Sequence, residues 1–558
     1  MLFRSRANVV YVGANDGMLH GFRAGGYDTN GNFTTATTPN DGQEVLAYMP
    51  AAALNTIYNA NGNLDFSSPS YAHNLFVDAT PGTGELYYGN AWHTWLVGGL
   101  GGGGNANGVI GDNTTAGTGA IYALDITNPA NFSESNASSL VIKEWSPSNL
   151  SCTNYTGTNS CAGYLGNTYG TPVIRRLHNG NWAVLFGNGL NSPNGSAGLY
   201  VLLVANDGTT SFYYLDTGYG PSKDPLGKNN KNGIAYVTPA DLDGDHITDY
   251  VYAGDAFGNV WRFDLTSQNP TQWNVSTTPL FSTPAGQPIT SKVAVAAIPG
   301  TGTGAPRVLV SFGTGQAFPQ TQTNAATYAS GSAQWLYGVW DWNMNAWNRG
   351  AASAAQYATL NPTQTVTAST LLTQTITATS TSSGTTPSYR TVSNGKVCWV
   401  GSTACGSAAN ANTQYGWKLM LPSTTTGSGS SAVTNYEQVV YNPTLAYGMF
   451  IVNTTVPAVQ QILSCTSTPA SGYTMAISVA SGGAGTASFF GDNNNNFPTY
   501  NGGIVSGIGL SGTGTPSLVT ANKLPYLVQQ TVNGTGTVNQ INPSAAGVGS
   551  RLNWTKLR

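Results

Sequence analysis

One twelve-residue pattern occurs twice in this chain at identical spacing, and it limits the folds that the chain can adopt. Residues 11–22 and residues 252–263 both read Y-x-G-x-x-x-G-x-[LV]-x-x-F. Each copy predicts a buried strand, a glycine turn and a second strand that carries an aromatic residue. Looser copies begin at residues 95, 183, 307 and 449, and a degenerate copy covers roughly 502–530. Repeated units of this kind are typical of a β-propeller, whose blades close into a ring.

These units recur along the chain, so we predict an all-β protein in which residues 1–558 form a single β-propeller domain. Long insertions between strands make the blades irregular. Residues 361–390 are rich in Thr and Ser and poor in charge, which predicts an extended loop between two blades.

A second constraint is a ladder of carboxylates that directly precedes the second copy of the pattern. Asp241, Asp243, Asp245 and Asp249 occupy positions 1, 3, 5 and 9 of one loop, and the carbonyl of Ile247 lies at position 7. Ca²⁺ binds about six to eight oxygen ligands, and alternate residues of a tight turn direct their side chains inward. Four carboxylates this close repel one another unless a cation neutralises them. We therefore predict a calcium site with these five ligands.

The loop differs from an EF-hand at two positions. His246 replaces the glycine expected at position 6, and Tyr252 replaces the bidentate glutamate at position 12. The residues that follow predict strands and not a helix, so we expect a calcium-binding hairpin loop. Asp28–Asn32 and Asp492–Asn496 offer oxygens at positions 1, 3 and 5 and are weaker candidates for a further ion.

Charge and hydropathy narrow the possible partners. Charged residues make up 8 % of the chain, the formal net charge is −3, and no basic cluster occurs, so we expect no nucleic-acid partner. No apolar run reaches the roughly 18 residues that a membrane-spanning helix needs. Residues 1–6 precede the first predicted strand without an apolar signal region, so we expect any export signal to lie outside this chain.

The spacing of the cysteines favours an exported protein. Cys152 and Cys161 enclose a short polar loop, as do Cys398 and Cys405, and we predict two local disulfides. Cys465 is left without a predicted partner. No histidine stands at the spacing of a zinc site.

Catalytic patterns are weak. The glycine-rich residues 98–105 lack the Lys-Ser/Thr pair of a phosphate-binding loop. His20 and His93 lie in strand patterns and are interpreted as hydrogen-bonded structural residues. The tryptophans of residues 335–347 could stack on a sugar ring, but packing between blades explains them more simply.

Several segments together resemble one family. Residues Asn8-Val-Val-Tyr-Val-Gly-Ala-Asn-Asp-Gly-Met-Leu-His-Gly-Phe-Arg-Ala24 and Gly42-Gln-Glu-Val-Leu-Ala-Tyr-Met-Pro50 resemble the opening of the C-terminal propeller of the PilY/PilC family of type IV pilus biogenesis factors and tip adhesins. Further matches follow in order at residues 87–99, 241–264, 311–316 and 551–558. The resemblance implies a modified seven-bladed, quinoprotein-like propeller that is the C-terminal part of a longer exported protein.

The resemblance also implies a function. We expect a non-enzymatic factor at the pilus tip, on the surface of a Gram-negative bacterium, with minor pilins and host or abiotic surfaces as partners. Calcium at residues 241–249 would regulate pilus extension against retraction, and hence twitching motility and adhesion. No D-x-S-x-S motif of a von Willebrand A-type metal site occurs in this chain.

Two alternatives remain. A quinone-dependent dehydrogenase would share the propeller and also use calcium, but this chain has no adjacent cysteines and its carboxylates lie in a hairpin loop. A surface lectin-like adhesin is separable by a glycan-binding screen.

Overall fold

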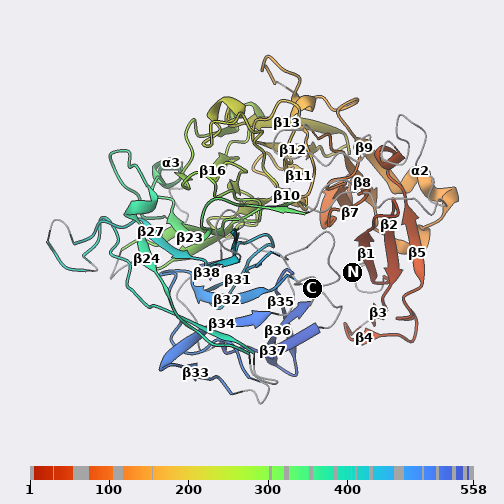
Figure 1. Ribbon diagram of the computed structural model, residues 1–558. Coiled ribbons are helices and arrows are strands. Elements are labelled where there is room, and N and C mark those ends of the chain that lie inside the picture. The colour runs from red at the N-terminus through yellow and green to blue at the C-terminus, as the bar shows by residue number, and fades with distance from the viewer. Residues whose placement is uncertain are drawn as a thin grey trace.

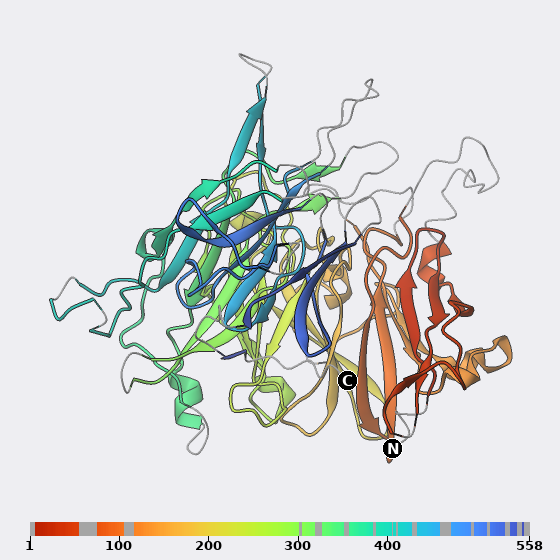
Figure 2. The same ribbon diagram turned by 90° about the horizontal axis from the view of Figure 1, so that it is seen from below.

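The computed structural model describes residues 6–551 except 29, 55–74, 105–116, 154, 301–303, 319–325, 351–355, 383–386, 404, 409–410, 427–431, 458–469, 493–495, 511–513, 531–535 and 544–549. Figure 1 shows mostly antiparallel sheets arranged around a common centre in chain order. Turned by 90°, they stand side by side, with the red first sheet and the cyan later sheets at opposite ends of the view (Figure 2). The predicted all-β propeller is confirmed.

Four sheets come from the first half of the chain. The first contains β1 (Val9–Gly13), β2 (Leu19–Arg23) and β5 (Glu44–Tyr48); the second β6 (Gly82–Tyr88), β7 (Ala91–Gly99), β8 (Ile121–Asp125) and β9 (Val141–Trp145). The third contains β10 (Val173–Arg176), β11 (Trp182–Gly187), β12 (Gly198–Val204) and β13 (Thr210–Asp216); the fourth β14 (Val237–Ala240), β15 (Tyr250–Gly254), β16 (Asn259–Asp264), β17 (Asn274–Val275) and β18 (Phe281–Ser282).

Two larger sheets follow. The fifth contains β19 (Ala294–Ile298), β20 (Arg307–Gly313), β23 (Trp335–Trp340), β24 (Leu372–Gln374), β27 (Gly416–Met420) and β38 (Ser550–Arg551). The sixth contains β25 (Ile376–Thr379), β26 (Tyr389–Val392), β30 (Thr444–Ala446), β31 (Met449–Asn453), β32 (Gly472–Ser478), β33 (Thr499–Tyr500) and β34 (Gly503–Leu510).

Short elements complete the described chain. Two-stranded pairs are β3 (Gly26–Tyr27) with β4 (Phe33–Thr34), β21 (Ala317–Phe318) with β22 (Thr327–Tyr328), and β28 (Ser423–Thr426) with β29 (Val433–Tyr436). The helices are α2 (Ala137–Leu140) and α3 (Asn345–Gly350), with 3-10 turns at Ala51–Ala53, Pro129–Asn131, Glu134–Asn136, Cys161–Tyr164, Pro221–Lys223, Pro270–Gln272 and Ala368–Thr370. Among the described residues, none of these helices has the length and apolar character needed to cross a membrane.

The number of blades differs from the expectation of seven. Six sheets of the described chain form blades, and the segment expected as a seventh, roughly 502–530, is divided. Its first part is β34, which pairs with β32 in the sixth sheet. The rest enters a three-stranded sheet of β35 (Ser517–Ala521), β36 (Leu524–Gln530) and β37 (Gly536–Gln540). Leu527 of this sheet is buried in the hydrophobic cluster of the sixth blade, so the small sheet packs against that blade.

The Thr/Ser-rich residues 361–390 are partly strand and not only loop. Strand β24 pairs in parallel with β27 of the fifth sheet. Strands β25 and β26 pair with each other, and β26 joins β34 of the sixth sheet. The insertion therefore connects two neighbouring blades through backbone hydrogen bonds.

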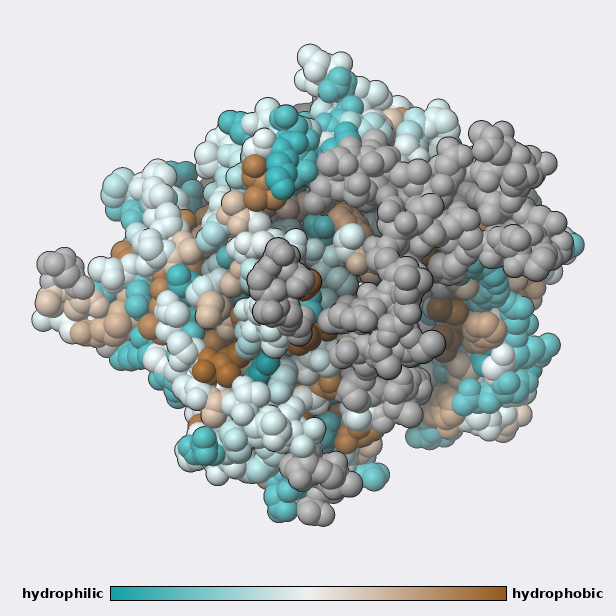
Figure 3. Space-filling view, in the orientation of Figure 1, coloured by the Kyte–Doolittle hydropathy of each residue, from teal (hydrophilic) through white to brown (hydrophobic). Residues whose placement is uncertain are grey.

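The hydrophobic core lies between neighbouring sheets. One cluster joins the second and third sheets through residues such as Trp95 and Tyr200, and another joins the third and fourth through Val201 and Trp261. All seven residues of β12 are buried, because that strand lies in the middle of its sheet and both of its faces are covered. On the face drawn in Figure 3, hydrophilic and intermediate residues predominate and hydrophobic residues occur in small groups.

The repeated motif owes its glycines to close packing and to turn geometry. At Gly254 a Cβ atom would come within 2.2 Å of Ile289, and Gly258 has a φ of +86°, which L side chains rarely adopt. Between them, the fully buried carboxylate of Asp255 accepts hydrogen bonds from the backbone of Asn259 and from the indole of Trp261. The motif therefore encodes a rigid turn that fits against the next blade.

Two disulfides are present in the described chain. Cys152 bonds to Cys161 and Cys398 bonds to Cys405. Each closes a short surface loop beside a blade. Cys465 lies outside the described residues.

Candidate functional site

The carboxylate ladder connects β14 to β15 in the fourth sheet. These strands pair antiparallel with Ala240 opposite Tyr250, so residues 241–249 form the loop of a hairpin. The loop also contacts the third sheet, because Ile247 forms a parallel bridge with Arg176 at the end of β10. The loop therefore lies where two blades meet.

Backbone conformation folds the loop around its first carboxylate. Asp241 accepts hydrogen bonds from the amides of Gly244, at 2.7 Å, and His246, at 2.9 Å. Both donors have positive φ, +84° for Gly244 and +69° for His246. The left-handed position that an EF-hand gives to glycine is thus occupied here by His246.

Three of the four predicted carboxylates come together. Oxygens of Asp241, Asp243 and Asp249 lie within 4.8 Å of one another, a spacing that suits ligands of one ion. Asp245 does not belong to this group, and its carboxylate accepts a hydrogen bond of 2.8 Å from the amide of Ile247. The position of the Ile247 carbonyl relative to an ion stays a prediction.

Asp249 anchors the group from inside the protein. Its side chain is fully buried and accepts a 2.6 Å hydrogen bond from the amide of Leu242. Burial raises the pKa of Asp249 to about 6, although hydrogen bonds from His178 and Leu242 lower it. Burial and the neighbouring Asp245 carboxylate raise the pKa of Asp243. Of the three carboxylates, Asp249 is therefore the one that water compensates poorly, whereas Asp241 is half-buried and Asp243 is exposed.

His178 is the neighbour that sequence patterns did not reveal. Its Nε2 atom lies 2.8 Å from Oδ1 of Asp249, and it comes from the loop between β10 and β11. The bond to Asp249 raises the pKa of His178, although burial opposes this shift. No local spacing connects residue 178 to residue 249, so only the packing of the two blades brings them together.

The donor set fits a hard divalent cation. Carboxylate oxygens are the ligands that Ca²⁺ prefers, and three of them converge in the loop. Asp241, Asp243 and Asp249 would hold the ion, which would supply the positive charge that the cluster lacks. His178 contacts the ligand Asp249 and would position it.

The weaker calcium candidates behave differently. The carboxylate of Asp28 accepts hydrogen bonds from the amides of Asn30 and Asn32, which closes an ordinary turn. The amide of Asn496 donates to Asp492 in the same way, and residues 493–495 lie outside the described chain.

The histidines and tryptophans have the structural roles that the sequence indicated. His20 is hydrogen-bonded to Asp16 and to Glu44, and Nδ1 of His93 lies 3.0 Å from Asp125. Within residues 335–347, Trp335 is half-buried and the other three tryptophans are buried.

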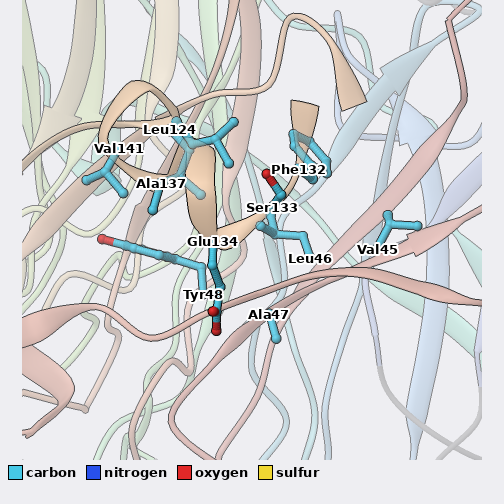
Figure 4. Close-up of a pocket in the computed structure, with 11 residues that line it drawn as sticks. Val45, Leu46, Ala47, Tyr48, Leu124, Phe132, Ser133, Glu134, Ala137 and Val141 are labelled. Atoms are coloured by element: carbon cyan, nitrogen blue, oxygen red, sulfur yellow. The ribbon is translucent and has the colours of Figure 1, made fainter. Parts of the chain in front are cut away.

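A separate apolar hollow of about 260 Å³ lies between β5 and the segment that contains α2. Figure 4 shows its lining, which includes Leu46, Leu124 and Phe132. These side chains belong to the hydrophobic region between the first and second sheets or pack against it.

Comparisons with known proteins give a consistent picture. A family model described as the PilY1 beta-propeller domain matches residues 2–383. The type IV pilus biogenesis factor PilY1 of Pseudomonas aeruginosa is 32 % identical in an alignment of 446 residues that covers 75 % of this chain and 32 % of that protein. A PilY1 homologue of Xylella fastidiosa is 31 % identical in an alignment of 347 residues that covers 60 % of this chain and 19 % of that protein. The chain thus spans about a third or less of the length of these relatives.

One solved structure covers nearly the whole chain. The crystal structure of the Pseudomonas aeruginosa PilY1 C-terminal domain superposes with a TM-score of 0.65 at 25 % identity. The match covers 96 % of this chain and 93 % of that domain.

Proposed function

Because the chain belongs to the PilY1 β-propeller domain family, we propose that it is a non-enzymatic factor of type IV pilus biogenesis whose loop 241–249 binds calcium. The observation that supports the calcium part is the convergence of three carboxylates, one of them fully buried, in a loop between two blades. The names of the relatives support the pilus part. Those names describe biogenesis factors and not enzymes, and the chain has no adjacent cysteines that would favour the dehydrogenase alternative.

In this proposal the ion joins two blades. Asp241, Asp243 and Asp249 all belong to the loop of the fourth sheet, and Asp249 is in addition hydrogen-bonded to His178 of the third, so the link to that blade runs through His178. Neutralising the cluster removes the repulsion that favours opening of the loop. Calcium then stabilises the conformation that binds it better, and only that conformation.

We further propose that this conformational choice tunes contacts with minor pilins at the pilus tip. Extension, retraction, twitching motility and adhesion to host or abiotic surfaces would follow from those contacts. The setting is the cell surface of a Gram-negative bacterium, as the organisms of the relatives suggest.

Calcium binding is tested by titration calorimetry on the purified chain. We expect a Kd of about 10⁻⁷–10⁻⁵ M, the range of sensor sites.

Asp241→Ala should abolish binding, because it removes a converging ligand. Asp245→Ala separates two ligand sets: loss of binding supports the five-ligand prediction, and retained binding restricts the set to the three converging carboxylates. Asp207→Ala, in an exposed turn, is the control. Wild-type protein that does not bind calcium contradicts the metal assignment.

The pilus role is tested in the host strain. A strain lacking the gene is complemented with the full-length wild-type gene or with its Asp241→Ala form. The number of surface pili and the frequency of pilus retraction are then measured. Loss of pili on deletion, with defective restoration by the variant, supports both parts of the proposal. Full restoration by a variant that does not bind calcium contradicts calcium regulation but leaves the biogenesis role intact. Unchanged pili after deletion contradict the biogenesis role.

A further inference from the structure

A second hollow, of about 300 Å³, lies where the hairpins of the second and third sheets end side by side. We name it the aromatic pocket. Its rings are Tyr87, Trp92 and Trp182, and its polar lining includes Arg176, Asn181 and Asn206. Its volume is at the lower end of the roughly 300–1,000 Å³ of small-molecule sites.

Trp92 is unusual among the tryptophans of this protein. Its exposed fraction is 48 %, and it is the one exposed tryptophan of the described chain, in which nine others are buried. Exposing a large aromatic ring to water is unfavourable, and the ring contacts of Trp92 leave nearly half of its surface uncovered. An exposed indole beside a pocket therefore points to a ligand.

Strand register sets Tyr87 against Trp92, and packing between the two blades adds Trp182. Tyr87 lies opposite Trp92 across the β6–β7 hairpin, with ring centroids 5.4 Å apart. Trp92 meets Trp182 of the next blade edge to face at 5.7 Å. The wall of the pocket is thus built by both blades.

Polar groups lie beside these rings. Arg176 lies directly opposite Trp182 on the neighbouring strand, and its side chain is exposed. Among the described residues, no ion pair includes Arg176. The side-chain amides of Asn181 and Asn206 add both donors and acceptors.

The two hairpins are held in place without a ligand. The amide of Gly89 donates a 2.7 Å hydrogen bond to the carbonyl of Asn206, which joins the second blade to the third. Tyr88, next to Gly89, stacks on His93 at 3.9 Å, and His93 is hydrogen-bonded to Asp125. The pocket is therefore largely pre-formed, which lowers the entropic cost of binding.

From this arrangement we infer that the aromatic pocket binds a saccharide. The C–H face of one sugar ring would lie on the indole of Trp92, while hydroxyl groups bond to the amides of Asn181 and Asn206. Arg176 favours a sugar that carries a carboxylate, because a guanidinium recognises a carboxylate through paired charged hydrogen bonds. A uronic acid combines these features.

A proline-rich peptide is the competing occupant, since aromatic grooves also bind such segments. The observations favour the sugar. Arg176, Asn181 and Asn206 line the hollow, and sugar hydroxyl and carboxylate groups pair with such side chains, whereas a proline ring offers them no hydrogen-bonding group. The inference stands apart from the pilus and calcium roles, because binding is measured on the purified chain.

The test is a fluorescence and calorimetric titration of the purified chain with methyl glucuronide, methyl glucoside and decaproline. We expect saturable binding of the glucuronide, a blue shift of tryptophan emission, and several-fold weaker binding of the glucoside. Trp92→Ala should weaken glucuronide binding at least about tenfold. Arg176→Gln should reduce the preference for glucuronide and leave glucoside binding nearly unchanged.

Phe33→Ala is the matched control, because Phe33 is also an exposed ring in an aromatic pair, with Tyr27, but does not line the pocket. It should bind glucuronide like the wild type. The inference is overturned if neither sugar binds, if Phe33→Ala loses as much glucuronide affinity as Trp92→Ala, or if Trp92→Ala binds glucuronide as tightly as the wild type. Binding of decaproline alone overturns it in favour of a peptide site.

Discussion

The Nε2 atom of His178 lies 2.8 Å from Oδ1 of Asp249, and this contact joins the loop of one blade to the carboxylate cluster of the next. The same β10–β11 hairpin carries Arg176 and Trp182 of the aromatic pocket. One short hairpin thus contacts both the candidate metal site and the proposed saccharide site.

This shared hairpin predicts coupling between the two ligands. Calcium should fix Asp249 and, through His178, the hairpin that carries Arg176. Saturating calcium should then increase the affinity for methyl glucuronide, and glucuronide should increase the affinity for calcium by the same factor, about 5–150-fold for typical allosteric pairs. Calorimetric titration of each ligand with and without the other measures both factors.

His178→Ala should reduce this coupling, while glucuronide binding without calcium stays close to that of the wild type. Equal glucuronide affinity with and without calcium would show that the two sites are independent.

The buried carboxylate of Asp255 predicts a large effect on stability. It accepts hydrogen bonds from Asn232, Asn259, Trp261 and the amide of Phe257. Asp255→Ala would leave these buried donors unpaired and should lower the free energy of unfolding by about 3 kcal/mol or more. Denaturant unfolding measures the change. Asp207→Ala, in an exposed turn, should change stability little; a similar loss in both variants would argue against a special role for Asp255.

A buried ion pair holds part of the Thr/Ser-rich insertion. Arg390 of β26 forms two hydrogen bonds to Glu437, at 2.6 and 2.8 Å, and both side chains are nearly inaccessible. Glu437→Leu would leave the guanidinium uncompensated and should cost about 3–5 kcal/mol. Thermal unfolding compares this variant with Asp41→Leu, which breaks the exposed pair with Arg23 and should have little effect. Equal stability of the Glu437 variant and the wild type would refute the prediction.

His20 predicts a dependence of stability on pH. Hydrogen bonding to Glu44 and then to Asp16 raises the pKa of His20, although burial opposes the shift. A group whose folded-state pKa is raised stabilises the folded protein fully below its unfolded pKa, near 6.5, and loses this contribution as the pH rises through the folded pKa.

The melting temperature of the wild type should therefore exceed that of His20→Gln more at pH 5.5 than at pH 9. Titration of the groups that do not contact His20 is common to both proteins and cancels in the difference between them. A difference that grows with pH would contradict the assignment.

Local chemistry made much of the fold predictable. The spacing of Gly254, Gly258 and Phe263 indicated the hairpin that the structure contains, because turn geometry and strand alternation depend on near neighbours in sequence. The candidate loop was predictable for the same reason, since Asp241 and Asp243 are brought together by their own turn.

Other features depended on contacts between distant segments. A strand pattern indicates that a segment is extended but does not identify the strand with which it pairs. The pairing of β26 with β34 and the division of residues 502–530 between two sheets could therefore not be inferred from the sequence. His178 and Trp92 carried no local signal of a site for the same reason.

The sequence by itself determined that this chain forms repeated hairpins, a propeller and a loop of carboxylates. Only the tertiary structure decided that three of those carboxylates converge, that His178 meets Asp249, and that Trp92 faces Trp182 beside a pocket. The physical reason is that turns and strands arise from neighbours along the chain, whereas these contacts arise where blades pack against each other to bury apolar surface.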